Sequence, residues 1–269
     1  MTVGLVTHVP HASIFIPVDC RADFLLTDDE LAYQARRSAD LFCDELFDIK
    51  TGRRVAAGQS RLVCDVERFR DDRLERSALK GNGLYYINTL LGAPLRPDDP
   101  ALRDKILTQF YDPHHTRQTA AVDCALAEND VCLILDGHSF TEEMAIYERQ
   151  FEEMALTERF VGGVRIADGL PDFCIGADDF HTPGFLVDAA HAILRGLEYS
   201  VETNRPFTGS IVPMKHYGKD KRVYSLMIEV NKRLYLKDYG FEKSEGFGRV
   251  RRACAGTAEG LLKAIEQYQ

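Results

Sequence analysis

The sequence predicts an α/β fold with a mixed, mostly parallel central sheet and helices on both faces. Two observations support this fold class. Short runs rich in Val, Ile and Leu alternate with longer amphipathic stretches, which is the pattern of strands alternating with helices. The more continuous apolar runs are typical of strands that are covered on both faces. The predicted strands are VGLVTHV (3–9), RLVCDV (61–66), VCLILD (131–136) and SLMIEV (225–230).

Three longer stretches have the periodicity of helices. In the first, Thr27 and Glu30 form a capping-box pattern, and apolar residues then recur at helical spacing as far as Ile49. The second covers about 100–128 and is interrupted by Pro113. The third closes the chain, and its apolar face contains Val250, Cys254, Leu261 and Ile265.

Length and composition favour one soluble enzyme domain over residues 1–269, because no linker or internal repeat divides the chain. Segments 70–100 and 140–183 are predicted to form long loops over the sheet. A net charge of -9 argues against a nucleic-acid partner. No apolar run approaches the roughly 20 residues that span a bilayer, and no signal-peptide pattern opens the chain, so we expect a cytoplasmic protein without a membrane partner. The seven cysteines form no CxxC pair and are expected to be reduced.

Polar residues with metal-binding chemistry follow the predicted strands. His11 follows the first strand, Asp136 and His138 lie at the end of the third, and Glu229 lies near the end of the fourth. Ligands of α/β sheets gather beyond the carboxyl ends of the strands. Two imidazoles, a ligating carboxylate such as Asp40 and a free carboxylate are the components of a hydrolytic zinc site.

Each of these residues also has an ordinary structural interpretation. A single histidine at a strand end is more often hydrogen-bonded in the core than bound to a metal, and Asp40 alone would be a solvated helix residue or a cap. Glu229 is harder to explain in this way, because a buried carboxylate is costly unless it is paired or bound. His8 lies three residues before His11 and would face the opposite side of a continued strand, so we expect it to pack or to support the site.

Six motifs occur in the order found in one known family. They are VPHAS, ADLFCDELF, SRLVCDVER, LDGHS, NRPFTG and IEVNKRLY, and they span residues 8–235. On these motifs the chain resembles the N-formylglutamate amidohydrolase family, which is similar in fold and site to the zinc carboxypeptidases and the zinc-dependent N-acetylmuramoyl-L-alanine amidases. The resemblance implies a zinc-carboxypeptidase-like hydrolase fold with one catalytic zinc ion. It suggests His11, Asp40 and His138 as ligands and Glu229 as the general base, with Asp44 and Glu45 lying close to Asp40 in the sequence.

The chain departs from the usual family pattern at three places. Residues 12–13 are Ala-Ser where the family commonly has Ser-Gly. Residues 65–68 read Asp-Val-Glu-Arg where the family often has Asp-x-Asn-Arg. Lys232 separates an Asn and an Arg that are usually adjacent. These changes fall near expected substrate contacts, so they bear on the substrate more than on the chemistry.

The resemblance implies hydrolysis of N-formylglutamate to glutamate and formate. This small anionic substrate carries two carboxylates, which arginine binds better than lysine does. Arg61 and Arg68 are the first candidates for binding it. Further candidates are Asn204, Arg205, His216 and Arg233. The alternatives are a metal-dependent amidase acting on another N-acyl amino acid or a peptidoglycan fragment, and a non-catalytic ligand-binding domain of the same fold.

Overall fold

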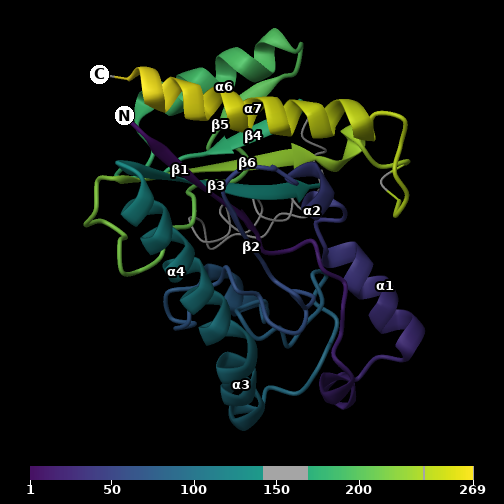
Figure 1. The fold of residues 1–269 in the computed structure, drawn as a ribbon. Helices are drawn as coiled ribbons and strands as arrows, with labels where there is room; N and C mark the ends of the chain where they lie inside the picture. Colours follow the sequence, from purple (N-terminus) through teal and green to yellow (C-terminus); the bar gives the residue numbers. More distant parts are fainter. Residues whose placement is uncertain (142–168, 239, 269) are drawn as a thin grey trace, which may run out of the picture.

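The structure, a computed structural model, describes residues 1–141, 169–238 and 240–268, and its centre is a six-stranded sheet with the strand order β2-β1-β3-β6-β4-β5 (Figure 1). β2, β1, β3 and β6 pair in parallel, β4 is antiparallel to β6, and β5 is parallel to β4. The mixed, mostly parallel sheet of the predicted fold class is therefore confirmed. The strands are β1 (Val3–Val9), β2 (Arg53–Ala56), β3 (Val131–Phe140), β4 (Phe173–Gly176), β5 (Val201–Thr203) and β6 (Val223–Asn231).

Helices cover both faces of the sheet, as predicted (Figure 1). α2 (Cys43–Leu46), α6 (Gly184–Gly196) and α7 (Phe247–Gln267) contribute to one core together with the alternate residues Leu133 and Leu135 of β3. α4 (Asp112–Glu128) packs on the other face against Cys132 and Ile134. Because side chains alternate along a strand, Asp136 and His138 continue the α4 face beyond Ile134.

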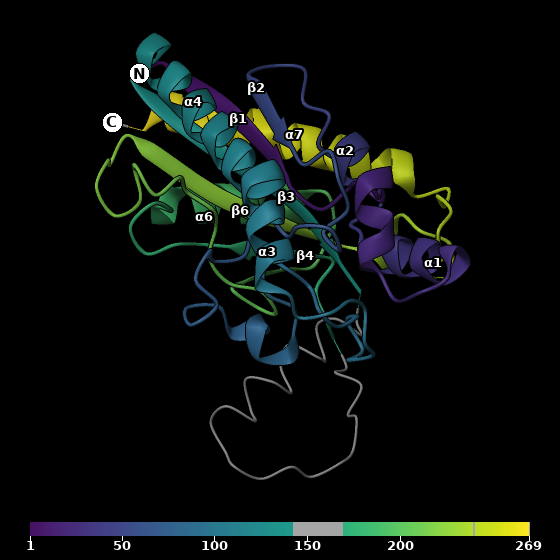
Figure 2. The ribbon, with the colours of Figure 1, turned by 90° about the horizontal axis from the view of Figure 1, so that it is seen from below.

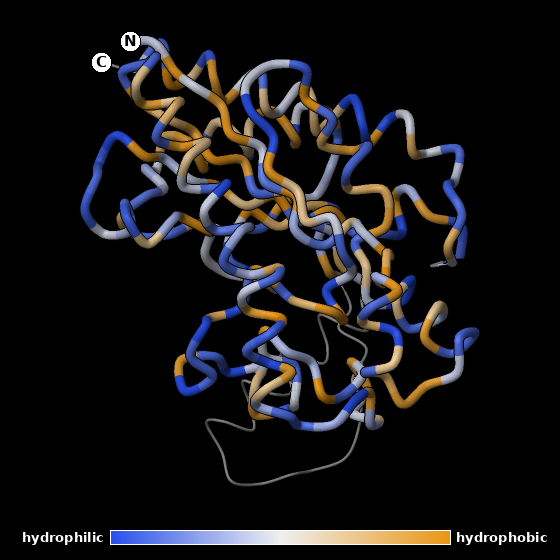
Figure 3. Tube along the Cα trace, turned by 60° about the horizontal axis from the view of Figure 1, so that its bottom comes forward, coloured by the Kyte–Doolittle hydropathy of each residue, from blue (hydrophilic) through white to orange (hydrophobic). Residues whose placement is uncertain are grey.

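A second layer, rich in loops, lies below the sheet and holds a separate core (Figures 1 and 2). Leu62, Val63 and Val66 pack there with Leu84 and Tyr86, all of them buried. Figure 3 shows apolar stretches running through the sheet and through this layer. The remaining regular elements of the described residues are a 3-10 turn (Val18–Asp23), α1 (Asp28–Ser38), a 3-10 turn (Arg76–Lys80), α3 (Pro100–Ile106), a π-helical turn (Leu107–Tyr111) and, directly after β6, a 3-10 turn (Lys232–Leu234).

The strand predicted at 61–66 is wrong, because this run forms turns and the second strand is β2 at Arg53–Ala56. The run is apolar because it lies in the lower core, and its backbone is satisfied by side chains and loops instead of by a sheet. The Arg96 guanidinium donates to the Val63 carbonyl at 3.0 Å, and the Asp65 N–H donates to the Leu84 carbonyl at 2.9 Å. Periodicity cannot distinguish these two ways of burying a short apolar run.

The capping box at Thr27 is present, but the helix that it begins ends at Ser38. Phe42 then adopts a left-handed conformation (φ 64°), and the short α2 follows. The single helical stretch predicted as far as Ile49 is therefore two helices, α1 and α2, separated by a turn. In the second helical segment the π-helical turn precedes Pro113, which lies in the first turn of α4, where proline is tolerated.

Most of the long loop expected at 140–183 lies outside the described residues, while β4 lies within its last part. In the described part of the chain, no helix is both long and apolar enough to cross a membrane.

Candidate active site

Two pairs of residues face each other across neighbouring strands of the sheet. The register of β1 and β3 pairs His8 with Asp136, and that of β3 and β6 pairs His138 with Glu229. Paired residues of parallel strands point to the same face. The alternation along β3 therefore brings these four side chains together on the α4 side of the sheet, near the carboxyl ends of the strands.

The turn between α1 and α2 brings Asp40 to His11. The Asp40 N–H donates to the His11 carbonyl at 2.9 Å, and the left-handed Phe42 reverses the chain immediately afterwards. Both side chains are almost completely buried. The break in the predicted helix is therefore what places Asp40 in the site.

The histidine rings share one carboxylate oxygen of Asp40. Asp40 Oδ2 lies 3.7 Å from His11 Nδ1 and 3.3 Å from His138 Nδ1. Glu67 enters the same space, with its carboxylate 3.6 Å from His11 Nδ1 and 3.1 Å from His138 Nε2. His11, Glu67 and His138 offer donor atoms that all lie within 4.8 Å of one another. The sequence prediction did not include Glu67.

Asp65 holds the far side of His11. Its Oδ1 accepts from His11 Nε2 at 2.8 Å, and its Oδ2 accepts two bonds from the Arg61 guanidinium, at 3.1 and 2.7 Å, and one from the Tyr86 hydroxyl at 3.0 Å. Both Arg61 and Asp65 are buried. This network keeps a proton on Nε2 of His11, so Nδ1, which faces Asp40, is the nitrogen that could bind a metal ion.

Asp136 holds His138 in a similar way, with Oδ1 3.1 Å from His138 Nε2. The same oxygen lies 2.7 Å from His8 Nδ1, and His8 Nε2 lies 2.9 Å from His114 Nε2 on α4. All of these side chains are buried. Each of the two site histidines is thus supported by a buried aspartate on the side away from Asp40.

Charge and burial perturb the ionisation of the cluster. Burial would lower the pKa of His138, but Glu67 and Asp136 outweigh it and hold that pKa well above the ordinary value. Burial and Arg61 would lower the pKa of His11, but Asp65 and Asp40 raise it on balance. The pKa of Asp40 is held below its usual range, because hydrogen bonds from both histidines overcome the effect of burial.

Glu229 differs from the other carboxylates. Burial, reinforced by the nearby Asp40 and Glu67 and opposed by His138, raises the pKa of Glu229 to about 8. Its Oε2 is buried and has no hydrogen-bond partner among the described residues. A buried carboxyl with an unused oxygen beside two histidines is available for proton transfer.

Lys232 and Gly137 fix the surroundings of the site. The buried Lys232 ammonium donates to the Ala39 carbonyl at 2.7 Å and lies 3.7 Å from Asp40 Oδ1. Gly137 leaves room for Phe47, the residue that follows α2, since a Cβ atom there would lie 2.5 Å from the Phe47 ring. A larger residue between Asp136 and His138 would therefore push the strand away from α2.

Arg61 and Arg68 are the predicted substrate residues that the structure brings close to the site. Arg61 is committed to Asp65, as described above. Arg68 is held more loosely, with Nε 3.5 Å from Asp65 and one terminal nitrogen 3.8 Å from Glu75, and its side chain is 27% exposed. It is therefore better able than Arg61 to exchange a carboxylate partner.

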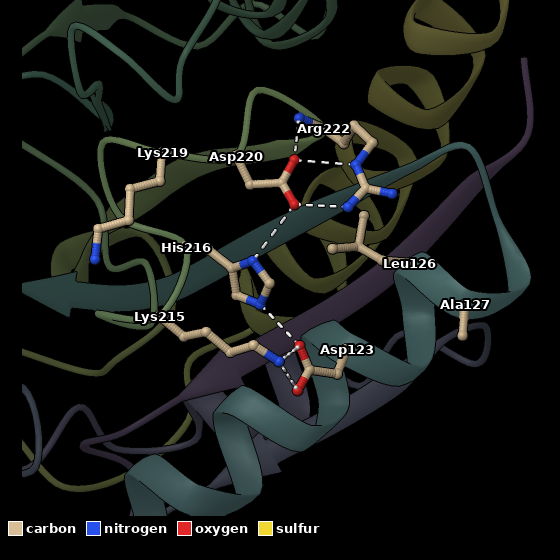
Figure 4. Close-up of a pocket in the computed structure, with 8 residues that line it drawn as sticks. All are labelled: Asp123, Leu126, Ala127, Lys215, His216, Lys219, Asp220 and Arg222. Carbon is tan, nitrogen blue, oxygen red and sulfur yellow. Dashed lines mark hydrogen bonds and ion pairs between the residues drawn. The ribbon is translucent and has the colours of Figure 1, made fainter.

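The other predicted substrate residues have partners elsewhere. Arg205 pairs with Glu202, Arg233 pairs with Asp172, and the Asn204 side chain accepts from the Ala177 N–H. His216 lies in a different pocket, between Asp123 of α4 and Asp220 (Figure 4). None of the described contacts joins these residues to His11 or His138, and their role in substrate binding stays a prediction.

The donor set fits a divalent metal ion. Imidazole nitrogens and carboxylate oxygens are zinc ligands, and bonds of 2.0–2.1 Å in a tetrahedron separate the donors by about 3.4 Å. The separations of 3.3 and 3.7 Å around Asp40 Oδ2 are close to that value. With both histidines neutral, as ligation requires, the carboxylates outnumber the cations of the cluster, and a divalent ion would balance the excess. The carboxylates are Asp40, Asp65, Glu67, Asp136 and Glu229, and the cations are Arg61, Arg68 and Lys232.

A buried histidine–carboxylate cluster at the carboxyl ends of a mixed α/β sheet is the arrangement expected of a hydrolytic enzyme. The family model of N-formylglutamate amidohydrolase matches residues 3–236. The chain therefore belongs to the N-formylglutamate amidohydrolase family and is an amidohydrolase.

Two solved structures have a similar fold. The N-formylglutamate amidohydrolase from Ralstonia eutropha JMP134 is 24% identical, with a TM-score of 0.76 over 98% of this chain and 94% of that chain. The gene product Atu2144 from Agrobacterium tumefaciens is 20% identical, with a TM-score of 0.60 over 98% of this chain and 92% of that chain. Curated protein sequences contain no significant match.

Proposed function

We propose that the chain hydrolyses the amide of N-formylglutamate, giving glutamate and formate, and that it needs one divalent metal ion, zinc by its donor set. One arrangement of side chains carries the proposal. Asp40 Oδ2 lies between His11 Nδ1 and His138 Nδ1, each ring is held from behind by a buried aspartate, and the sheet register places Glu229 beside His138. The family match supports the amide as the bond that is cleaved.

His11, Asp40 and His138 would hold the ion. When bound, zinc supplies an acidified water and polarises the carbonyl of the scissile amide. Asp65 and Asp136 keep the two rings in the orientation that ligation requires, since each accepts from the ring nitrogen that does not face Asp40.

Glu229 would transfer the proton. Its buried carboxylate accepts a proton from the attacking water and then donates it to the leaving amine, the two-way role of a positioned carboxylate. In the metal-free site the pKa of Glu229 is about 8, and a nearby divalent cation would favour the ionised form that acts as a base. Substrate carboxylate binding falls to Arg68, because Arg61 is neutralised by Asp65.

The test compares Glu229→Gln with His138→Ala on zinc-loaded protein. We expect Glu229→Gln to retain zinc and to lose at least about a hundredfold in kcat, the lower range for an acid–base residue. His138→Ala should lose both zinc and activity. Metal content is measured by mass spectrometry, and Glu242→Gln, at an exposed carboxylate that pairs with Lys237, serves as the matched control. Full activity of a folded Glu229→Gln protein would contradict the proposal, as would a wild-type protein whose activity survives complete chelation.

Glu67 favours a second candidate function, hydrolysis of an N-acyl amino acid with a single carboxylate. A carboxylate at this position, where the family often has asparagine, adds negative charge beside both histidines and disfavours a dianion. Formyl-, acetyl- and longer acyl-derivatives of glutamate, aspartate and glutamine separate the two candidates. The first predicts the highest kcat/KM for N-formylglutamate and a raised KM for that substrate in Arg68→Ala. The second predicts preference for the glutamine derivative.

A further inference from the structure

A chain of four buried side chains connects α4 to the candidate metal ligand His138. Starting on α4, His114 Nε2 lies 2.9 Å from His8 Nε2, His8 Nδ1 lies 2.7 Å from Asp136 Oδ1, and Asp136 Oδ1 lies 3.1 Å from His138 Nε2. His8 is completely buried and His114 nearly so. The function proposed above uses Asp136 but gives no role to either of these histidines.

The donors and acceptors available to each side chain determine which atom donates in each of these hydrogen bonds. An ionised Asp136 can only accept, so His8 must donate from Nδ1. His114 Nδ1 is buried without a partner. A partnerless acceptor costs less than a partnerless N–H, so Nδ1 is the unprotonated nitrogen and His114 donates from Nε2 to His8. Burial lowers the pKa of His114 to about 2, which agrees with a neutral ring.

The same donors and acceptors fix the state of the metal-binding ring. Asp136 Oδ1 receives the His8 proton and also faces Nε2 of His138, so His138 donates from Nε2, and the proton that a metal ion would displace is the one that Asp40 accepts from Nδ1. That nitrogen is the one 3.3 Å from Asp40 Oδ2. These hydrogen bonds therefore determine which nitrogen of His138 is available to a metal ion.

We propose that His8 and His114 are positioning residues, which hold Asp136 so that His138 presents Nδ1 to the metal ion. The inference rests on the proposed function, because it assumes a metal at His11 and His138. The distances argue against an alternative in which His8, Glu67 and Asp136 hold a second cation. His8 Nδ1 and Asp136 Oδ1 are 2.7 Å apart, a hydrogen-bond length and shorter than the roughly 3.4 Å between donors on one tetrahedral zinc ion.

The experiment uses pairs of amide substitutions that differ only in where the N–H lies. An asparagine amide replaces the Nδ1–H of histidine, and a glutamine amide replaces Nε2–H. His8→Asn therefore keeps the bond to Asp136, and His8→Gln loses it. His114→Gln keeps the bond to His8, and His114→Asn loses it. The zinc dissociation constant of each full-length variant is measured by competition with a chromophoric chelator, and its fold is checked by circular dichroism.

A buried histidine remote from the cluster provides the matched control. His181 is completely buried, its Nδ1 bonds the Val223 carbonyl at 2.8 Å, and its Nε2 accepts from the Gly218 N–H at 2.9 Å. His181→Leu therefore removes two buried hydrogen bonds and leaves the contacts of His114, His8, Asp136 and His138 unchanged. We expect it to lower the thermal unfolding temperature while the zinc dissociation constant stays within about twofold of the wild-type value.

The range of about 10- to 100-fold applies to the direct partner of a ligand, so the expected result is a zinc dissociation constant raised about 10-fold in His8→Gln and about 5-fold in His114→Asn, which acts one bond further away. His8→Asn and His114→Gln should stay within about threefold of wild type. Wild-type affinity in His8→Gln would overturn the inference, and so would equal losses in His8→Asn and His8→Gln, because the effect would then not depend on the donated proton. If the wild-type protein itself binds no zinc, the proposed function fails and this inference fails with it.

Discussion

Replacing Asp65 with asparagine tests the idea that one buried carboxylate supports both the lower layer and the metal site. The substitution preserves the shape of the side chain but removes its charge. The buried Arg61 guanidinium, which donates two bonds to Asp65, is then left without a counter-charge. Breaking a buried ion pair by removing one partner costs about 3–5 kcal/mol. The asparagine oxygen can serve only one side of the network. When it faces the Arg61 and Tyr86 donors, the amide NH2 turns toward His11 Nε2, so the carboxylate that holds the ring is lost and zinc binding should weaken by about 10- to 100-fold.

Urea denaturation of the metal-free protein measures the loss in the free energy of unfolding, and chelator competition measures zinc affinity. Asp71→Asn is the matched control, because Asp71 pairs with Arg73, whose side chain is 88% exposed. An exposed pair contributes only about 0–1 kcal/mol. A loss below about 1 kcal/mol in Asp65→Asn, or unchanged zinc affinity, would refute the reasoning.

Two further predictions concern packing and pH. Gly137→Ala should cost about 1–3 kcal/mol in urea denaturation, because its Cβ would lie 2.5 Å from the Phe47 ring, whereas Gly58→Ala, with open space around it, should cost almost nothing. In the metal-free protein the pKa values of His11 and His138 are raised above the ordinary 6.5, so their contribution to stability is complete below pH 6.5 and is lost as pH rises through the raised values. Since zinc binds neutral imidazole, the rise in unfolding temperature on adding zinc should grow as pH increases above 6.5 through the raised pKa values of the two histidines, and a constant or shrinking rise would contradict this.

Hydrophobic patterning predicted the central part of the fold because the central strands are long and covered on both faces. β1, β3 and β6 bury nearly every residue, so their sequences are continuous apolar runs. β4 and β5 are four and three residues long, which is too short for periodicity to identify. The 61–66 run satisfies its backbone through the Arg96 side chain, a tertiary contact that local sequence does not reveal.

The sequence predicts those residues of the candidate site that lie at the ends of predicted strands. His11, His138 and Glu229 lie at or just beyond the ends of their strands, and the sheet register alone pairs the last two. Glu67 and Asp65 were not predicted as site residues, because the lower layer carries them to the histidines. The departure from Asp-x-Asn-Arg at residues 65–68 was the one signal at this position, and it was read as a substrate contact.

The scatter of the site along the chain has a consequence for how folding can be followed. The side chains around the two histidines come from residues as far apart as His8 and Glu229, and they meet only when β3 and β6 have paired in the correct register. A slip of one residue would turn Glu229 to the opposite face of the sheet. The proposed ligands His11, Asp40 and His138 meet once β1 has paired with β3 and the turn at Asp40 has closed on His11, so uptake of a metal ion by refolding protein reports that part of the assembly. Recovery of activity also needs Glu229 and therefore reports the later or simultaneous pairing of β3 with β6 in the correct register.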